Sequence, residues 1–166
     1  NCEFSSKCNG LCIGSEMAAG VENVYMYNVH VEDCHTAIYF KSNLDRGGFI
    51  RNVWVSDVTS NHVRTAFIRF ENNYHGGRGG FHPTTFENFT LKNIHGKDSD
   101  DCGFYAVGVE GYPIRNVVLE NVTFDKTEVP YVLRNAEDIH FRKVSINGEM
   151  LPEIPENTEM IKLKLM

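Results

Sequence analysis

The sequence lacks the features of several common protein classes. No apolar run approaches the roughly 20 residues that a membrane-spanning helix needs, and the opening NCEF lacks the basic and apolar segments of a signal peptide. Basic residues are in deficit, because 16 Lys and Arg stand against 22 Asp and Glu, which gives a net charge of −6. We therefore expect no general affinity for nucleic acid or membranes, and an anionic ligand would need a local basic patch.

The cysteines lack the paired spacing of a zinc site. They stand at positions 2, 8, 12, 34 and 102, an odd number without a C-x-x-C pair. We expect unpaired thiols buried in the core. Residues 69–82 hold two histidines among glycines, which is weak evidence for a metal. We predict neither a metal site nor a cofactor.

A short phrase recurs along the chain. It opens with Asn or Asp and carries apolar residues at its second and fourth places. Its copies begin at Asn23, Asn52, Asn88, Asn116 and, less clearly, Asp138, at intervals of 29, 36, 28 and 22 residues. This alternation is typical of a strand with one face in a core. A second strand-like run lies after each of the first four copies, at residues 37–40, 66–70, 104–109 and 131–133.

The repeat predicts an all-β fold. A unit of this size without a helical pattern cannot bury its apolar face alone, so successive units must stack. We predict a right-handed parallel β-helix of about five coils over residues 1–151, with residues 152–166 as a tail or a covering strand. Asn, Asp and Gly suit its corners because they tolerate left-handed backbone angles, and stacked asparagines can form a ladder. An antiparallel sandwich would not explain a phrase that returns at whole-coil spacing.

The register of the phrase predicts which side chains face inward. Equivalent inward positions are expected for Val24, Val53, Phe89, Val117 and Ile139. Tyr25 and Trp54 should point outward, because alternation leaves them on the other face. Residues 1–4 already match residues 28–31, which places Cys2 inward beside Val29 without a preceding cap. We expect missing N-terminal coils or another chain to cover this end.

Several phrases together resemble a known family. They are CNGLCIGSE at residues 8–16, GVENV at 20–24, AIYFKSN at 37–43 and RGG at 46–48. From residue 1 to about residue 147 the chain resembles the C-terminal half of polygalacturonases, which are pectin-degrading glycoside hydrolases. The resemblance implies a pectin-lyase-like β-helix from a secreted or periplasmic enzyme, which hydrolyses an acidic plant polysaccharide with inversion.

The family's catalytic phrases, Asn-x-Asp and Asp-Asp, lie upstream of its Gly-His-Gly phrase, and that upstream region is absent from this chain. The adjacent acids Asp100 and Asp101 lie downstream, in what we interpret as a solvated polar turn. The catalytic residues are therefore not assigned, and the chain is expected to be an inactive fragment. A non-catalytic carbohydrate-binding β-helix and a purely structural β-helix are the alternatives.

The resemblance implies four substrate-binding residues. The Gly-His-Gly position reads Cys8-Asn9-Gly10, so Asn9 offers an amide that cannot titrate. The Arg-Ile-Lys position reads Tyr39-Phe40-Lys41, which keeps a cation in Lys41 and offers the ring of Tyr39 to a sugar face. Tyr74, in the glycine-rich segment, stands about where the family has a substrate-contacting tyrosine. We expect Asn9 and Lys41 to occupy corresponding positions on neighbouring coils and to converge with Tyr39 and Tyr74 on an acidic oligosaccharide.

Overall fold

The computed structural model describes residues 1–158, which form strands without a helix. The strands are β1 (Cys2–Ser5), β2 (Asn9–Ile13), β3 (Val21–Lys41), β4 (Phe49–Glu71), β5 (Thr85–Ser99), β6 (Cys102–Val107), β7 (Ile114–Lys126), β8 (Val129–Arg134), β9 (Ala136–Ile146) and β10 (Glu149–Met150). Among these residues there is accordingly no helix of the length and apolarity that a membrane span requires.

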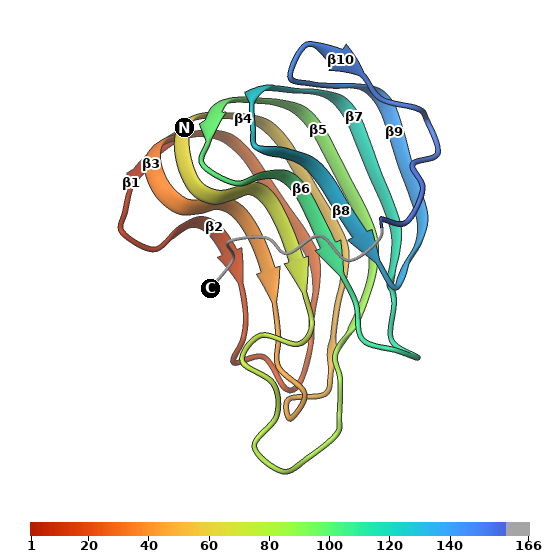
Figure 1. Ribbon diagram of the computed structural model, residues 1–166. Coiled ribbons are helices and arrows are strands. Elements are labelled where there is room, and N and C mark those ends of the chain that lie inside the picture. The colour runs from red at the N-terminus through yellow and green to blue at the C-terminus, as the bar shows by residue number, and fades with distance from the viewer. Residues whose placement is uncertain (159–166) are drawn as a thin grey trace.

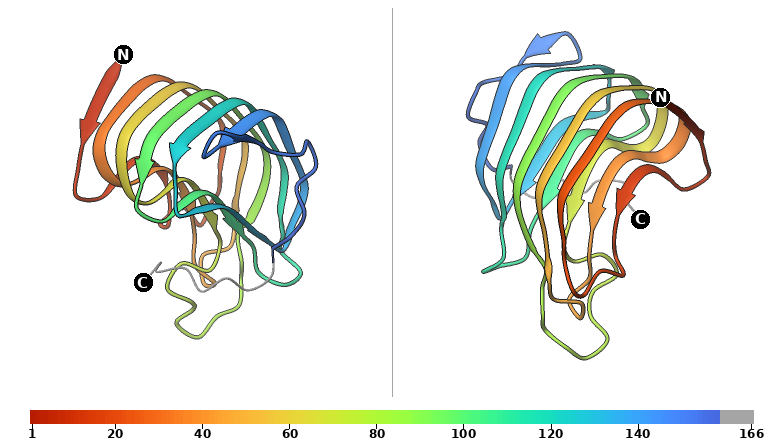
Figure 2. Two further views of the ribbon diagram at one scale, coloured as in Figure 1. Left: turned by 45° about the horizontal axis from the view of Figure 1, so that its top comes forward. Right: turned by 180° about the vertical axis from the view of Figure 1, so that it is seen from behind.

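The strands stack in parallel, one coil upon the next. One row runs in the order β1, β3, β4, β5, β7 and β9, while β2 pairs with β3, and β6 pairs with β4 and β8 (Figure 1). Only the short β10 is antiparallel, against β9, among the named strand pairs of the described chain. A view tilted toward the top of the molecule and a view from behind show the curved strands following one another along the stack (Figure 2). The predicted parallel β-helix is confirmed.

The predicted register is confirmed along the whole stack. The phrase positions pair in sequence as Val24, Val53, Phe89, Val117 and Ile139. Cys2 pairs with Val29, as expected from the half-phrase at the start of the chain. Tyr25 and Trp54 point outward, with 65% and 39% of their surfaces exposed, and their rings stack at 4.6 Å.

The core is a column of apolar side chains enclosed by the coils. Phenylalanine rings from successive coils meet inside it, with Phe40, Phe70 and Phe89 at centroid distances of 4.8 to 5.0 Å. Each is almost completely buried. Burial of such a side chain stabilises a fold by about 1.5–3 kcal/mol, so the stacked rings hold neighbouring coils together.

Asparagine ladders mark two corners of the coils. At the first corner, Asn52 donates to Asn23 at 3.3 Å, Asn88 to Asn52 at 3.0 Å and Asn116 to Asn88 at 2.8 Å. A second ladder runs from Asn121 through Asn93 to Asp57. Asn88 and Asn121 begin sequences that match the N-glycosylation acceptor, and their place in the ladders gives both a structural role.

Two expectations about individual residues are wrong. Cys34 and Cys102 are buried free thiols, but Cys2, Cys8 and Cys12 are exposed because they lie on the first coil or on its turns. Burial raises the pKa of the Cys34 thiol to about 11. Asp101 is also not solvated, since only 5% of its surface is exposed.

The last described residues lie against the final coil. The peptide nitrogen of Phe141 donates to the oxygen of Glu153 at 2.8 Å, and that of Thr158 donates to Leu133 at 2.9 Å. Residues 151–158 contain no strand. The boundary between residues 151 and 152 stays a prediction, and the alternating segment at residues 161–165 lies outside the described residues.

Candidate functional site

A hollow of about 240 Å³ lies where β2 and the ends of β3 and β4 run side by side. Its lining consists of Lys7, Cys8, Asn9, His35, Tyr39, Lys41, Arg69 and Tyr74, and we call it the basic pocket. All four residues expected from the sequence, Asn9, Tyr39, Lys41 and Tyr74, are among them. The structure therefore brings these four side chains together, while their role in binding stays a prediction.

The strand pairing of Asn9 and Lys41 differs from the pairing expected. Asn9 pairs with Thr36 on the neighbouring coil, whereas Lys41 pairs with Glu71 on the coil after it. Asn9 and Lys41 are thus not corresponding positions. The β2–β3 ladder places Asn9 beside Thr36, five residues before Lys41, and continues to Ile13 beside Phe40.

Tyr39 forms the floor of the pocket. Only 2% of its surface is exposed, and its hydroxyl donates to Glu71 Oε2 at 2.6 Å. Burial raises the pKa of this phenol far above its ordinary value, so it remains a neutral donor. The expected stacking of its ring on a sugar face is wrong for this conformation, because the ring is covered.

Lys41 is the cation closest to the aromatic side chains. Its ammonium lies 4.1 Å from the centroid of the Tyr74 ring and 5.4 Å from that of Tyr39, distances typical of cation–π contacts. The two tyrosine rings meet edge to face at 6.2 Å. Among the ion pairs of residues 1–158, none includes Lys41. Its charge is therefore available to an anionic ligand.

Arg69 is a pocket residue that the sequence reasoning missed. It is 8% exposed, pairs with Tyr39 in the parallel ladder and lies 5.1 Å from its ring centroid. Its guanidinium donates to Glu71 Oε2 at 2.9 Å, the same oxygen that accepts from Tyr39. A charged residue inside the apolar run at residues 66–70 was the signal that could have identified it.

His35 and Lys7 were also missed, and no local pattern marks either of them. His35 is half-buried, and its pKa is lowered by burial and by the nearby cations Arg69, Arg64 and Lys41. Lys7 is exposed on the turn between β1 and β2. The lining of the basic pocket contains no Asp or Glu among the described residues. Glu71 offsets the charge of Arg69, so the positive charge of the pocket comes from Lys7 and Lys41, in a protein of net charge −6.

The glycine-rich segment lies beside the pocket. It forms the long loop between β4 and β5 that projects from the stack (Figure 1). The peptide nitrogen of Tyr74 donates to Ser42 at 2.8 Å, and Asp45 accepts from the nitrogens of Arg78 and Gly80 at 2.5 and 3.0 Å. These bonds fasten the loop to the preceding coil and position the ring of Tyr74.

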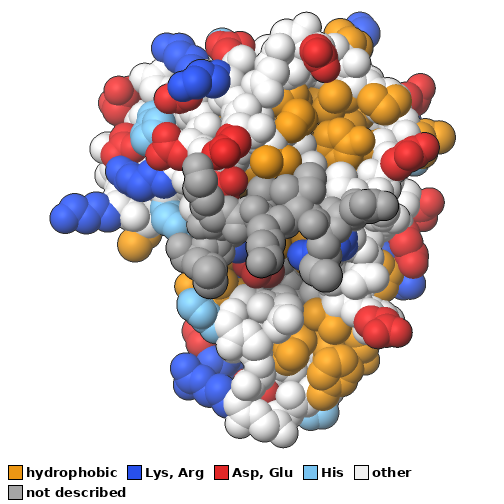
Figure 3. All heavy atoms as spheres, in the orientation of Figure 1, with side chains coloured by type: hydrophobic (Ala, Val, Ile, Leu, Met, Phe, Trp, Pro, Cys, Tyr) orange, Lys and Arg blue, Asp and Glu red, His pale blue; other side chains and the backbone are white. Residues whose placement is uncertain are grey.

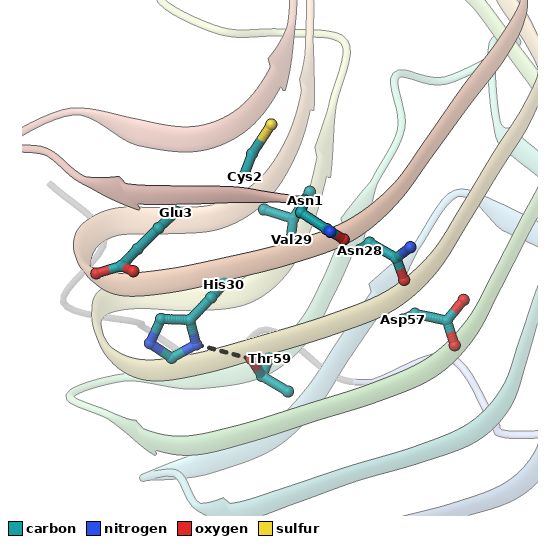
Figure 4. A pocket seen from close by; sticks show the side chains of 8 residues that line it. All are labelled: Asn1, Cys2, Glu3, Asn28, Val29, His30, Asp57 and Thr59. Carbon is teal, nitrogen blue, oxygen red and sulfur yellow. Dashed lines mark hydrogen bonds between the residues drawn. The ribbon is translucent and has the colours of Figure 1, made fainter.

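A larger hollow, of about 490 Å³, lies against β1 and is open to solvent (Figure 4). His30 Nδ1 lies 2.7 Å from Thr59 Oγ1 there, and Glu3 and Asp57 also line it. This hollow has two acidic groups and no Lys or Arg in its described lining, so it does not suit an anionic ligand. We therefore favour the smaller basic pocket.

One group of described side chains has metal-ligand chemistry. His62, Asp98 and Asp100 place one candidate ligand atom each within 4.8 Å of one another. His62 is already bonded to Asp33 at 2.9 Å and to Asp100 at 3.2 Å, and Lys126 is bonded to Asp98 at 2.9 Å. These partners neutralise the carboxylates, and the group is explained as an ion-pair network.

Comparisons with known proteins agree with this fold. No protein-family model matches the chain. A probable polygalacturonase of Vitis vinifera is 22% identical over 157 residues, which cover 90% of this chain and 32% of the relative. A probable endopolygalacturonase of Aspergillus fumigatus is 31% identical over 107 residues, covering 61% of this chain and 28% of the relative.

A solved structure has the same fold. The hyperthermoactive exopolygalacturonase of Thermotoga maritima superposes with a TM-score of 0.80 and 23% identity, over 86% of this chain and 32% of that one. The chain is thus polygalacturonase-like in sequence and has the β-helix fold of that structure. It spans about a third of the length of the relatives it matches.

Proposed function

We propose that this polygalacturonase-like chain forms part of the substrate groove of a pectin-degrading glycoside hydrolase. In this proposal the basic pocket holds a uronate unit of the polysaccharide, and the full-length protein cleaves the chain with inversion. Export to the periplasm or the cell exterior, where pectin is available, belongs to the same proposal.

The single observation that carries the proposal is the charge of the pocket. Lys7 and Lys41 converge with Arg69 on one hollow without a carboxylate in its described lining, and only Arg69 among the three has an ion-pair partner, Glu71. Lys41 can attract a uronate carboxylate, and Asn9 can both donate to and accept from sugar hydroxyls. Tyr74 contributes a ring that is partly exposed, unlike that of Tyr39.

The test is an NMR titration of the 166-residue protein with trigalacturonate, with galactotriose as the matched neutral ligand. Affinity for trigalacturonate should be on the order of millimolar, about −4 kcal/mol, because the pocket is small and open. Shifts should cluster around Lys41 and Tyr74 and weaken with salt. Lys41→Ala should weaken binding by about threefold to tenfold, as expected for a partly exposed charge pair worth of order 1 kcal/mol.

Lys92→Ala is the control, since Lys92 does not line the basic pocket and pairs with Glu120 at 2.9 Å. It should bind trigalacturonate as the parent protein does. Equal binding of the neutral trimer, or equal loss in both lysine variants, would contradict the proposal. A protein that binds neither trimer would favour a structural β-helix.

A second candidate is a non-catalytic carbohydrate-binding β-helix. It is favoured by Asn9, an amide at the position where the family motif has a titratable histidine. Both candidates require the pocket to bind sugar. They differ in whether the full-length protein hydrolyses polygalacturonate, which a reducing-end assay measures directly.

A further inference from the structure

His35 occupies a fixed place at the edge of the basic pocket. Its peptide nitrogen donates to the oxygen of Cys8 at 2.6 Å, which ties it to the turn before β2. Its Nδ1 lies 3.3 Å from Thr36 Oγ1 and 3.5 Å from Thr65 Oγ1. The imidazole is therefore held by neutral hydroxyls, and no carboxylate within residues 1–158 forms an ion pair with it.

The groups around His35 come from every element that packs against it. Lys7 belongs to the turn before β2, Lys41 to β3, and Arg64 and Arg69 to β4. The remaining ionisable neighbours in the lining are Cys8, Tyr39 and Tyr74.

The carboxylates nearest to these cations already have partners. Glu71 accepts from Tyr39 and Arg69, and Asp33 pairs with His62 and Arg64. Arg64 and Arg69 are therefore partly compensated, whereas neither Lys7 nor Lys41 belongs to an ion pair of the described residues, so positive charge prevails around His35.

This environment sets the charge of the empty pocket. Burial is the main reason why the pKa of His35 is below its ordinary value, and repulsion by Arg69, Arg64 and Lys41 adds to it. At neutral pH the imidazole is therefore uncharged. A carboxylate that enters the pocket would raise the pKa of His35, because its negative charge favours the imidazolium.

We infer that the basic pocket takes up a proton on His35 when it binds a carboxylate, so that occupancy is coupled to pH. This inference rests on the proposed function and adds a regulation of the same site. The imidazole and the ligand carboxylate form a charge-assisted pair only in the complex. By linkage, binding must strengthen as pH falls between the pKa of His35 in the complex and its lower pKa in the empty pocket.

Calorimetry tests the coupling with trigalacturonate between pH 4.5 and 8, in two buffers of different ionisation enthalpy. The parent protein should take up between zero and one proton per ligand. Its affinity should rise on acidification by up to about tenfold per pH unit, the limit for one coupled proton. His35→Gln should change affinity by less than about twofold over the same range.

His75→Gln is the matched control, because His75 lies in the neighbouring loop with its ring 4.0 Å from that of Tyr74. It should keep the parent pH profile. NMR of the parent protein gives a second readout, in which ligand should raise the midpoint of the His35 titration. Loss of the pH dependence in His75→Gln, or an unmoved His35 midpoint, would overturn the assignment.

The two hypotheses fail in different ways. Binding that depends on Lys41 but is independent of pH would overturn the proton coupling and leave the proposed function standing. Absence of trigalacturonate binding at every pH would overturn both.

Discussion

At the corners of the coils, asparagine combines a backbone conformation with a side-chain contact. Nine of the thirteen described non-glycine residues with positive φ are asparagines. Left-handed angles cost most L-residues about 1–2 kcal/mol, and asparagine reduces this cost through local hydrogen bonds. Its amide has both a donor and an acceptor, so each corner residue can bond to the coil before it and the coil after it.

Asn52 provides the test of this dual role, because it has φ 54° and bonds to both Asn23 and Asn88. Asn52→Ala should reduce the free energy of unfolding by about 1–2 kcal/mol, since it loses the ladder and strains the backbone. Asn52→Gly loses the ladder alone and should cost about 1 kcal/mol less than the alanine variant. Urea denaturation measures the free energy of unfolding of the two variants. Equal values would show that the left-handed backbone angle at this position does not affect stability.

Between neighbouring strands, charged side chains alternate in sign along the stack. Glu22, Arg51, Glu87, Arg115 and Glu137 occupy one column in register. Arg51 pairs with Glu22 at 2.7 Å, and Arg115 with Glu137 at 2.9 Å. Figure 3 likewise shows acidic and basic side chains interspersed on the face it displays. Each exposed ion pair contributes little to stability. A shifted register would place like charges opposite one another, and their repulsion disfavours that register.

A second column contains a histidine and therefore links strand pairing to pH. Asp33, His62, Asp98 and Lys126 lie in register. Hydrogen bonds to Asp33 and Asp100 raise the pKa of His62, while the bond to His62 is the main cause that lowers the pKa of Asp33. Protonated His62 stabilises three coils at once.

The stabilisation that His62 provides depends on pH because its pKa is raised in the folded protein. A raised pKa gives His62 a stabilising contribution that is fully present below its unfolded pKa of about 6.5 and is lost as pH rises through the folded value. The contribution also fades at strongly acidic pH, when Asp33 takes up a proton at its lowered pKa.

We expect His62→Gln to destabilise the protein more at pH 5.5 than at pH 8.5. Urea denaturation of both proteins at each pH measures the difference, with His140→Gln as control, because His140 lies outside this column. A His62→Gln effect that is constant with pH would contradict the network.

For the molecule as a whole, we expect the 166-residue chain not to hydrolyse polygalacturonate. The described lining of the pocket offers no carboxylate to donate or accept a proton, and Glu71 is held by Tyr39 and Arg69. A reducing-end assay should show no rate, and Asn9→His alone should not create one. A rate that is proportional to protein concentration and lost in Glu71→Gln would contradict this expectation.

The sequence by itself determined the β-helix. A phrase with period-two alternation that returns once per coil can bury its apolar residues only by stacking, so Val53, Phe89 and Val117 could be aligned without a structure. The corner asparagines agree with this repeat, because they favour the left-handed backbone angles that the turns of each coil require. The exposed thiols of Cys8 and Cys12 were not predictable in this way, because burial depends on which coils and turns cover a strand.

Only the tertiary structure decided the composition of the pocket. His35, Arg69 and Lys7 meet there from three parts of the chain, and register and turns, not local sequence, set which side chains become neighbours. The register of β2 against β3 places Asn9 opposite Thr36 and not at a position equivalent to Lys41. Residue motifs identified four side chains that line one hollow, and the packing of the coils then fixed which other charges surround them.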